Sequence, residues 1–404
     1  MKKKGSVLGG TLLITGSCIG AGMLGLPILT GMAGFFPSFL MFVLAWLFMT
    51  STALLMVEIL GWFKTPVNMI SMVGHTLGPI GKLLCWLLYL FLFYALLVAY
   101  MSASGSHVAL LLQHLFRLPL PNWAGTLFFV IIFGWIVYLG AKPVDYLNRY
   151  LMLGKILAYI ALVFFGVQYI VPRFLMHFEP KYALFSFPIL IISFGFQNMV
   201  PVLMQYMDGD RKRVRKTIYA GSIFAFVIYL VWELVALGVL PFTEVMQSYR
   251  QDMDAAQSLR MYVRSNFIGY SAQSLAFFAI LTSFLAQALS LAHFLGDGLK
   301  VKRKERENIW MCALALIPPL IFTMMFKDLF FKAINFAGGI CAIVLFGILP
   351  ALMVWIGRYR KNKLLPDRVP GGRMVLICLL LMGSFIFFYQ LTIMLGIPIF
   401  PKPH

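Results

Sequence analysis

Two short stretches of small and polar residues interrupt long apolar runs, and they are the parts of the sequence best suited to chemistry. The first is Gly16–Gly22, and the second is Ser193–Pro201, which contains the neighbouring amides Gln197 and Asn198. A transmembrane helix satisfies its backbone groups internally because hydrocarbon offers no partners, so such clusters at mid-depth indicate opened helices. Opened helices at corresponding positions of two repeats are typical of substrate sites in secondary transporters. The two breaks therefore predict a transporter and mark its substrate site.

An amino-acid zwitterion at these breaks would need a partner for each of its charges. The amides of Gly20–Gly22 would begin a second half-helix, whose positive end suits a carboxylate. Carbonyl groups freed at Thr15–Ser17 and Ser193–Gly195 would suit the ammonium. The alternative is that the glycines only let helices pack closely. The substrate-binding residues expected on the two stretches are Thr15, Gly16, Ser17, Gly20, Ala21, Gly22, Ser193, Phe194, Gly195, Phe196, Gln197 and Asn198.

The side chains of the second break suggest an aromatic substrate. Phe194 and Phe196 flank the break and could cover a bound ring by offset or edge contact, or they could be ordinary packing residues. Gln197 and Asn198 are amides that need hydrogen-bond partners at this depth. They are expected to hold the unwound backbone open, with contact to a substrate hydroxyl as the alternative.

Composition places the chain in the membrane. Of its 404 residues, 61% are hydrophobic and 12% are charged, and the mean hydropathy is +0.89. Soluble domains carry about 25% charged residues, so a soluble enzyme is excluded. The net charge of +19 does not indicate nucleic-acid binding, because the basic residues form short clusters between apolar runs. The five cysteines form no CxxC pair and predict neither a disulfide framework nor a metal site.

Apolar runs of about the length that crosses a bilayer predict eleven membrane-spanning helices. Most of the 33 Lys and Arg residues lie in the segments on the N-terminal side of the membrane, so the positive-inside rule predicts a cytoplasmic N-terminus and a periplasmic C-terminus. The mixed charges of 241–267 predict short amphipathic helices on the opposite face. The expected spans are 7–33, 36–60, 81–105, 124–140, 148–171, 186–206, 215–240, 268–296, 308–326, 330–356 and 374–396.

An internal repeat is visible in the positions of the two breaks and of two glutamates. The separation between the breaks near Gly20 and Gln197 is nearly the same as that between Glu58 and Glu233. Each break lies in the first helix of a five-helix unit, and an odd number of spans inverts the second unit. We therefore expect inverted repeats at 1–171 and 172–356, followed by a basic loop and an eleventh helix at 357–404.

The motifs resemble a known family. Leu8–Gly10 with Gly20–Pro27, and Ser193–Phe196 with Val200-Pro201 and the basic run to Thr217-Ile218, are similar to segments of the hydroxy and aromatic amino acid permeases, in particular the bacterial tyrosine and tryptophan permeases. The resemblance covers essentially the whole chain. It implies an all-α, LeuT-like fold with 5+5 inverted repeats plus an eleventh helix, helices 1 and 6 discontinuous, in the bacterial inner membrane. It also implies proton-driven uptake of an aromatic amino acid.

Two further residues are interpreted through this resemblance. Tyr100 lies in a segment similar to one that faces the site in the family, with Tyr94 as the alternative. The family often has histidine after the second Phe-Gly-aromatic unit, where this chain has Gln197. A titratable role is therefore not carried over to that position.

Coupling to an ion gradient requires a group whose charge can change inside the membrane, and Lys155 is the main candidate. In a LeuT-like fold the fifth helix passes close to the eighth, where Thr282 and Ser283 would stand near the sodium position of sodium-coupled relatives. The Lys155 ammonium could take the place of that ion by releasing and rebinding a proton. The alternatives are a lysine that reaches to the interface and a true sodium site. Glu58 and Glu233 could relay protons or be structural partners.

These inferences predict a proton symporter that imports an aromatic amino acid, tyrosine above all, by alternating access. Sodium coupling, or another substrate such as tryptophan, phenylalanine or serine/threonine, is the alternative. A membrane-embedded enzyme would need a His-Asp, Gly-x-Ser-x-Gly or paired-Asp arrangement at membrane depth, which the sequence lacks. A channel would need a repeated ring of carbonyls or charges. We expect the amino acid and the lipid bilayer as partners, with no nucleic acid, obligatory protein partner, cofactor or metal.

Overall fold

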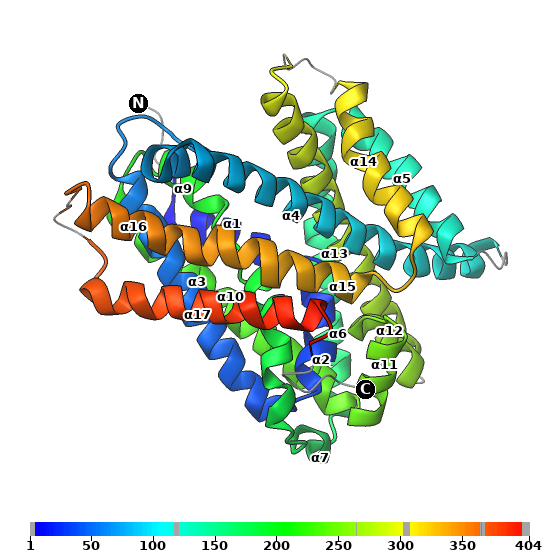
Figure 1. The fold of residues 1–404 in the computed structure, drawn as a ribbon. Helices are drawn as coiled ribbons and strands as arrows, with labels where there is room; N and C mark the ends of the chain where they lie inside the picture. Colours follow the sequence, from blue (N-terminus) through cyan, green and yellow to red (C-terminus); the bar gives the residue numbers. More distant parts are fainter. Residues whose placement is uncertain are drawn as a thin grey trace.

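The computed structural model describes residues 5–116, 121–263, 265–301, 308–363, 365 and 368–397, and its elements there are all helical. Figure 1 shows these helices gathered into one bundle. The elements are α1 (Val7–Cys18), α2 (Gly22–Gly31), α3 (Phe35–Leu60), α4 (Met69–Phe116), α5 (Asn122–Tyr138), α6 (Ala141–Gly166), η1 (Val167–Tyr169), α7 (Pro172–Leu175), η2 (Pro180–Ser186), α8 (Phe187–Ser193), α9 (Met199–Tyr206), α10 (Arg211–Val239), α11 (Phe242–Arg250), α12 (Ala255–Tyr262), α13 (Asn266–Gly298), α14 (Ile309–Met325), α15 (Phe330–Phe336), the π-helix η3 (Ala337–Ile348), α16 (Leu349–Tyr359) and α17 (Gly372–Met394).

The predicted multi-pass architecture is present in the described residues. Seven helices are long and apolar enough to cross a membrane, and the bent pair α1 and α2 makes an eighth candidate. Helices α5 and α14, with 17 residues each, are at the lower limit for a span. The pair α8 and α9 occupies the position of the broken sixth helix. Each of the eleven predicted runs therefore contains helical structure.

Both predicted breaks interrupt their helices. Helix α1 ends at Cys18, α2 begins at Gly22, and the two are bent by 60°. Helix α8 ends at Ser193 and α9 begins at Met199. The carbonyl and amide groups at these ends have lost their regular helical partners, so each break provides polar backbone in the middle of the bundle.

One sequence expectation needs adjustment at the third span. Helix α4 begins at Met69, well before the predicted 81, because a surface turn of helix merges with the span across a kink at Gly78. Gly78 has φ 82°, a left-handed conformation that glycine adopts without the Cβ penalty of other residues. The short amphipathic helices expected in 241–267 are found as α11 and α12.

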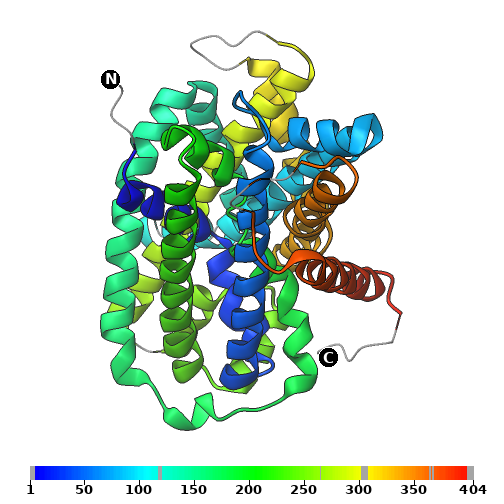
Figure 2. The same cartoon turned by 90° about the vertical axis from the view of Figure 1, so that its left-hand side faces the viewer.

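The helices pack in two interlocked sets. Helix α1 lies against α10 and α9 against α3, while α13 packs on α6 and α15 packs on α4. In an inverted repeat, each contact between a helix of one unit and a helix of the other recurs between their counterparts, and these pairs follow that rule. The boundaries of the repeats at 171/172 and 356/357 stay predictions. Figure 2 shows α3, α6 and α10 side by side, with the connector of η1, α7 and η2 passing across their ends.

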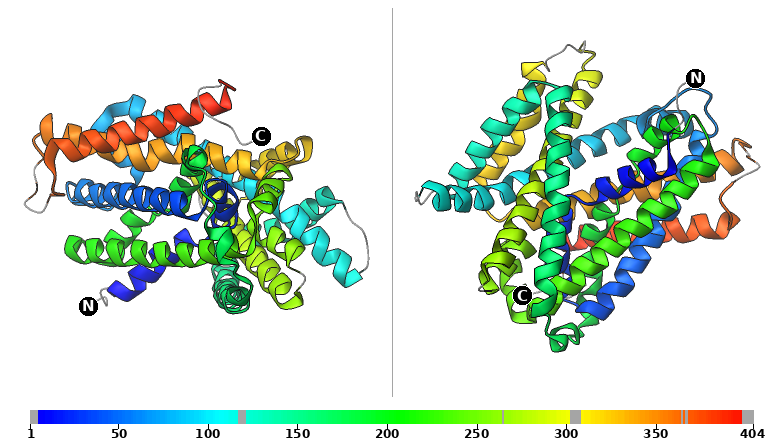
Figure 3. Two further views of the ribbon diagram at one scale, coloured as in Figure 1. Left: turned by 90° about the horizontal axis from the view of Figure 1, so that it is seen from below. Right: turned by 180° about the vertical axis from the view of Figure 1, so that it is seen from behind.

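The two ends of the bundle differ, and they are named here by their content. The basic end carries the loops around Gly61 and Asp210 and the described residues of 359–363 and 368–371. Lys361 donates there to the His75 carbonyl, and Arg211 approaches Gly61. The capped end carries α11 and α12, which pack on each other and on α2. In the right-hand view of Figure 3, α6 runs the length of the bundle between these ends.

Candidate functional site

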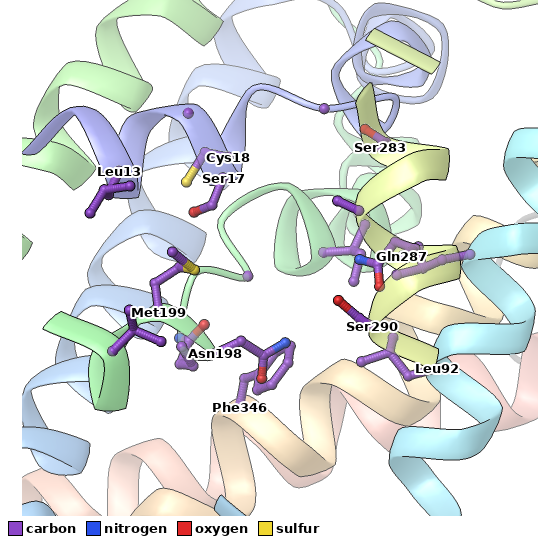
Figure 4. Close-up of a pocket in the computed structure, with 18 of the residues that line it drawn as sticks. Leu13, Ser17, Cys18, Leu92, Asn198, Met199, Ser283, Gln287, Ser290 and Phe346 are labelled. Carbon is purple, nitrogen blue, oxygen red and sulfur yellow. The ribbon is translucent and has the colours of Figure 1, made fainter. Parts of the chain in front are cut away.

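A cavity of about 930 Å³ joins the two breaks to the basic end of the bundle. Its walls come from both breaks and from α4, α6 and α13, and it extends to the loop 66–70. Figure 4 shows α1, α9 and α13 around this space. The residues expected from sequence that line it are Gly16, Ser17, Gly20, Gly22, Tyr100, Lys155, Ser193, Gly195, Gln197, Asn198, Thr282 and Ser283.

The first break is held open by α13. The Ala21 amide donates to the Ser283 hydroxyl oxygen at 3.0 Å, so a serine side chain takes the place of the missing helical acceptor. A Cβ at position 20 would lie 2.8 Å from that hydroxyl oxygen, which is closer than a side chain tolerates. A side chain at position 20 would displace the Ser283 hydroxyl and disturb its bond to the Ala21 amide, which glycine leaves intact.

Lys155 ends at this same break. Its side chain is 2% exposed, and Nζ donates to the Ile19 carbonyl oxygen at 2.5 Å and to Thr282 Oγ1 at 3.4 Å. Across the described ranges, no carboxylate lies within ion-pair distance of Nζ. Lys155 thus points to the break rather than toward the surface of the basic end, and its partners are uncharged oxygens.

A tyrosine that sequence reasoning missed connects the two breaks. The Tyr229 hydroxyl lies 2.5 Å from the Cys18 carbonyl oxygen and 2.9 Å from that of Ser193, so its one proton is shared between the ends of α1 and α8. The Ser193 hydroxyl oxygen lies next to Gly22, 3.3 Å from where a Cβ on that glycine would stand. This hydroxyl is buried and has no hydrogen-bond partner in the part of the chain that the structure describes.

The two amides of the second break have different roles. Gln197 is fully buried and donates through Nε2 to the Met49 carbonyl (3.0 Å) and Thr52 Oγ1 (3.1 Å), which fastens the unwound segment to α3. Asn198 faces the cavity, and its Oδ1 accepts from the Tyr89 hydroxyl at 2.7 Å. Gln197 therefore supports the backbone, whereas Asn198 offers its amide nitrogen to the cavity.

Several expected site residues lie away from the cavity. Phe194 and Phe196 are fully buried behind the second break, and Phe194 makes edge contacts with Phe42 and Tyr229. Thr15 donates to the Gly221 carbonyl instead of facing the cavity. Ala21 contributes its amide to Ser283 and is itself buried.

The two glutamates are also remote from the break. Glu58 accepts two hydrogen bonds from Arg358, at 2.7 and 2.6 Å, in a buried ion pair. Glu233 accepts from Thr30 Oγ1 at 2.8 Å, and its second carboxyl oxygen is buried without a partner among the described residues. The structure thus brings Lys155, Thr282 and Ser283 together and separates both glutamates from them.

Comparison with known proteins gives consistent matches along almost the entire chain. A family model described as the Tryptophan/tyrosine permease family matches residues 3–390. The "Tyrosine-specific transport system 1" of Haemophilus influenzae is 30% identical, over 94% of this chain and 95% of that protein. The "Tryptophan-specific transport protein" of the same organism is 29% identical, over 98% of both.

A solved structure matches the fold. The structure titled "Crystal structure of MhsT in complex with L-phenylalanine" superposes with a TM-score of 0.68, covering 97% of this chain and 99% of that chain at 14% identity. At this level of identity the likeness concerns the fold alone. The predicted all-helical, LeuT-like fold is therefore confirmed.

Proposed function

Because the chain belongs to the tryptophan/tyrosine permease family, and is a multi-pass permease rather than an enzyme, we propose that it imports an aromatic amino acid by proton symport, with tyrosine as the preferred substrate. Relatives named for tyrosine or tryptophan transport support the aromatic class. The basic end faces the cytoplasm of the bacterial inner membrane in this proposal, because the Lys and Arg residues concentrate there. The cavity then represents the route by which substrate leaves.

The observation that carries proton coupling is the position of Lys155. Its Nζ is 2.5 Å from the Ile19 carbonyl at the first break and has only neutral partners. An ammonium held by neutral oxygens in a membrane interior loses its proton more readily than one that is paired with a carboxylate. Release of the proton turns the charged donor to the Ile19 carbonyl into a neutral and weaker one, which ties the charge state of Lys155 to the geometry of the break.

The same break supports binding of a zwitterion. The N-terminus of α2, with Gly20 and Gly22 lining the cavity, offers the positive end of a helix to the substrate carboxylate. The unpartnered Ser193 hydroxyl, next to Gly22, is a neutral acceptor for the ammonium. Both groups come from breaks that Tyr229 holds together, so substrate binding and the arrangement of the two half-helices are linked.

Uptake into proteoliposomes tests the proposal. Radiolabelled tyrosine is supplied with an inside-alkaline gradient or a sodium gradient imposed separately, to wild type, Lys155→Met and Lys142→Met. The control lysine lies on the same helix but is exposed. We expect proton-driven, sodium-independent accumulation by wild type and Lys142→Met. Lys155→Met should lose gradient-driven accumulation by at least about tenfold while it still exchanges internal for external tyrosine.

Two outcomes would overturn parts of the proposal. Sodium-driven uptake that survives Lys155→Met would transfer coupling to a sodium ion at Thr282 and Ser283. Absence of aromatic amino-acid uptake under either gradient, with another amino acid transported instead, would overturn the substrate assignment.

A further inference from the structure

Helix α13 directs a row of polar side chains into the cavity beyond the first break. Ser283, Gln287 and Ser290 follow one another at intervals of four and three residues, so they share one face of the helix. All three line the cavity, and Figure 4 shows Gln287 and Ser290 projecting into it toward the side that carries Asn198 and Phe346. The Ser283 hydroxyl oxygen accepts a hydrogen bond from the Ala21 amide, whereas Gln287 and Ser290 lie nearer the basic end.

Gln287 and Ser290 have unused hydrogen-bonding capacity. Throughout the described residues, neither side chain makes a hydrogen bond, and Gln287 is half-buried within a membrane-spanning helix. The Ser290 hydroxyl is exposed to the cavity and does not donate to the carbonyl of the preceding turn either, so it is free to meet a ligand there. Polar groups at this depth are costly unless water or a ligand satisfies them.

The cavity into which Gln287 projects offers both apolar and polar surface. Leu92, Leu96 and Phe346 contribute hydrophobic surface to the cavity. The polar contribution is Asn198, whose Oδ1 is already occupied by Tyr89, so that its amide nitrogen remains available. A flat ring can lie against the apolar surface while a polar substituent reaches the amides, which is the usual construction of a specific small-molecule pocket.

The helix geometry sets the distance from the proposed head-group site. Four residues of α-helix advance about 6 Å, so Gln287 lies about 6 Å farther along the cavity than Ser283, which contacts the first break. An aromatic side chain that extends from a head group at the break along the cavity reaches the level of Gln287. Asn198 lies across the cavity from Gln287 in Figure 4, so two amides face the same space.

We propose that Gln287, assisted by Ser290, binds the polar group of the substrate's aromatic ring and so makes the protein prefer tyrosine over phenylalanine. This inference rests on the proposed function, because it assumes that the head group lies at the breaks. The Gln287 carboxamide can accept from the phenol hydroxyl and can also donate to it. Phenylalanine leaves that carboxamide without a partner, and a site built to bind a hydroxyl discriminates strongly against the analogue that lacks it.

The experiment compares tyrosine, tryptophan and phenylalanine as substrates of wild type, Gln287→Leu and Ser290→Ala. Gln205→Leu is the matched control, because Gln205 also lines the cavity but lies on α9, nearer the basic end. We measure kcat/KM for uptake, and affinity by calorimetry on the detergent-solubilised protein. Gln287→Leu should reduce the tyrosine-to-phenylalanine ratio by about 10- to 100-fold, Ser290→Ala by less, and Gln205→Leu not at all.

The readouts separate failure of this inference from failure of the proposed function. Unchanged phenylalanine binding by Gln287→Leu shows that the variant is folded. Equal losses for all three substrates, or a wild type that does not distinguish tyrosine from phenylalanine, would overturn the role of Gln287 and leave it as a wetted wall of the exit route. Loss of proton coupling alone would affect the proposed symport mechanism, because calorimetric selectivity does not depend on a gradient.

Discussion

The two ends of the bundle are fastened by different chemistry. At the basic end, Glu58 of α3 forms a two-point ion pair with Arg358 of α16, and Val369 adds its amide to the same carboxylate at 2.9 Å. At the capped end, two aspartates of the loop between α11 and α12 have partners other than arginine. Asp252 accepts from the amides of Phe330 and Phe331 at 2.8 and 3.0 Å. Asp254 caps α12 and lies 2.7 Å from His107 Nε2.

The contacts at the two ends differ in how strongly they depend on pH. A guanidinium stays charged at every physiological pH, so the pair at the basic end is a fixed feature of the fold. Asp252 at the capped end faces two neutral backbone amides, which do not hold a carboxylate in its charged form as a guanidinium does. We therefore expect the basic end to depend on charge and the capped end to depend on pH. Replacing each acid by its amide tests this contrast.

The largest effect is expected at the basic end. Glu58→Gln should lower the free energy of unfolding by about 3–5 kcal/mol, because it leaves the buried Arg358 guanidinium without its counter-charge. Thermal unfolding in detergent at pH 7.5 measures the loss.

The double variant Glu58→Met/Arg358→Met is the control for this prediction. Removing both charges should recover most of the stability, since buried ion pairs are often replaceable by apolar groups. A double variant as unstable as Glu58→Gln would mean that the ion pair is not the source of the loss, and that packing against the 369 segment is.

A smaller, pH-dependent effect is expected for Asp252. Burial raises the pKa of this carboxyl from 3.8 to about 6, and Asp328 adds to the increase, while the two amides and Lys332 oppose it. A raised pKa in the folded state means that folding binds a proton. The associated stability is present below the unfolded value near 3.8 and is lost as pH rises through about 6.

The measurement is the unfolding free energy between pH 4 and 7.5. Wild type should lose on the order of 2 kcal/mol over this window relative to Asp252→Asn, which does not titrate. The asparagine has one acceptor oxygen for the two amides, so the comparison concerns the pH dependence and not the absolute stability. Parallel pH profiles for the two proteins would contradict the assignment. Glu58→Gln should retain the wild-type pH dependence, because its site is at the other end.

Sequence alone located the breaks but not the contacts that hold them. Clusters of glycine and polar residues are costly in the middle of a membrane-spanning helix, so the interruptions at Gly20 and Gln197 could be predicted. The partner of Glu58 is Arg358, three hundred residues away, and no local pattern encodes that pairing. Tyr229 had no distinguishing signal among 17 tyrosines.

Two other site features show why side-chain direction was difficult to predict. Phe194 and Phe196 lie in unwound backbone, where helical periodicity no longer tells which way a side chain points, and both are buried away from the cavity. Gln287, by contrast, lies on a regular helix four residues after Ser283, so its shared face could have been inferred from spacing. Regular helices transmit positional information, whereas the breaks do not.

The smallest effect is expected for Asp254, and it separates its two roles. Asp254 Oδ1 accepts from the amides of Ala256 and Gln257, while Oδ2 contacts His107. Asp254→Asn keeps an N-cap acceptor of nearly equal quality, so the free energy of unfolding should fall by at most about 1 kcal/mol relative to wild type. Asp254→Ala removes the cap as well and should lose about 2 kcal/mol. If Asp254→Asn instead approached the loss seen for Glu58→Gln, the His107 contact would be a charged pair, and the capped end would be fastened as the basic end is.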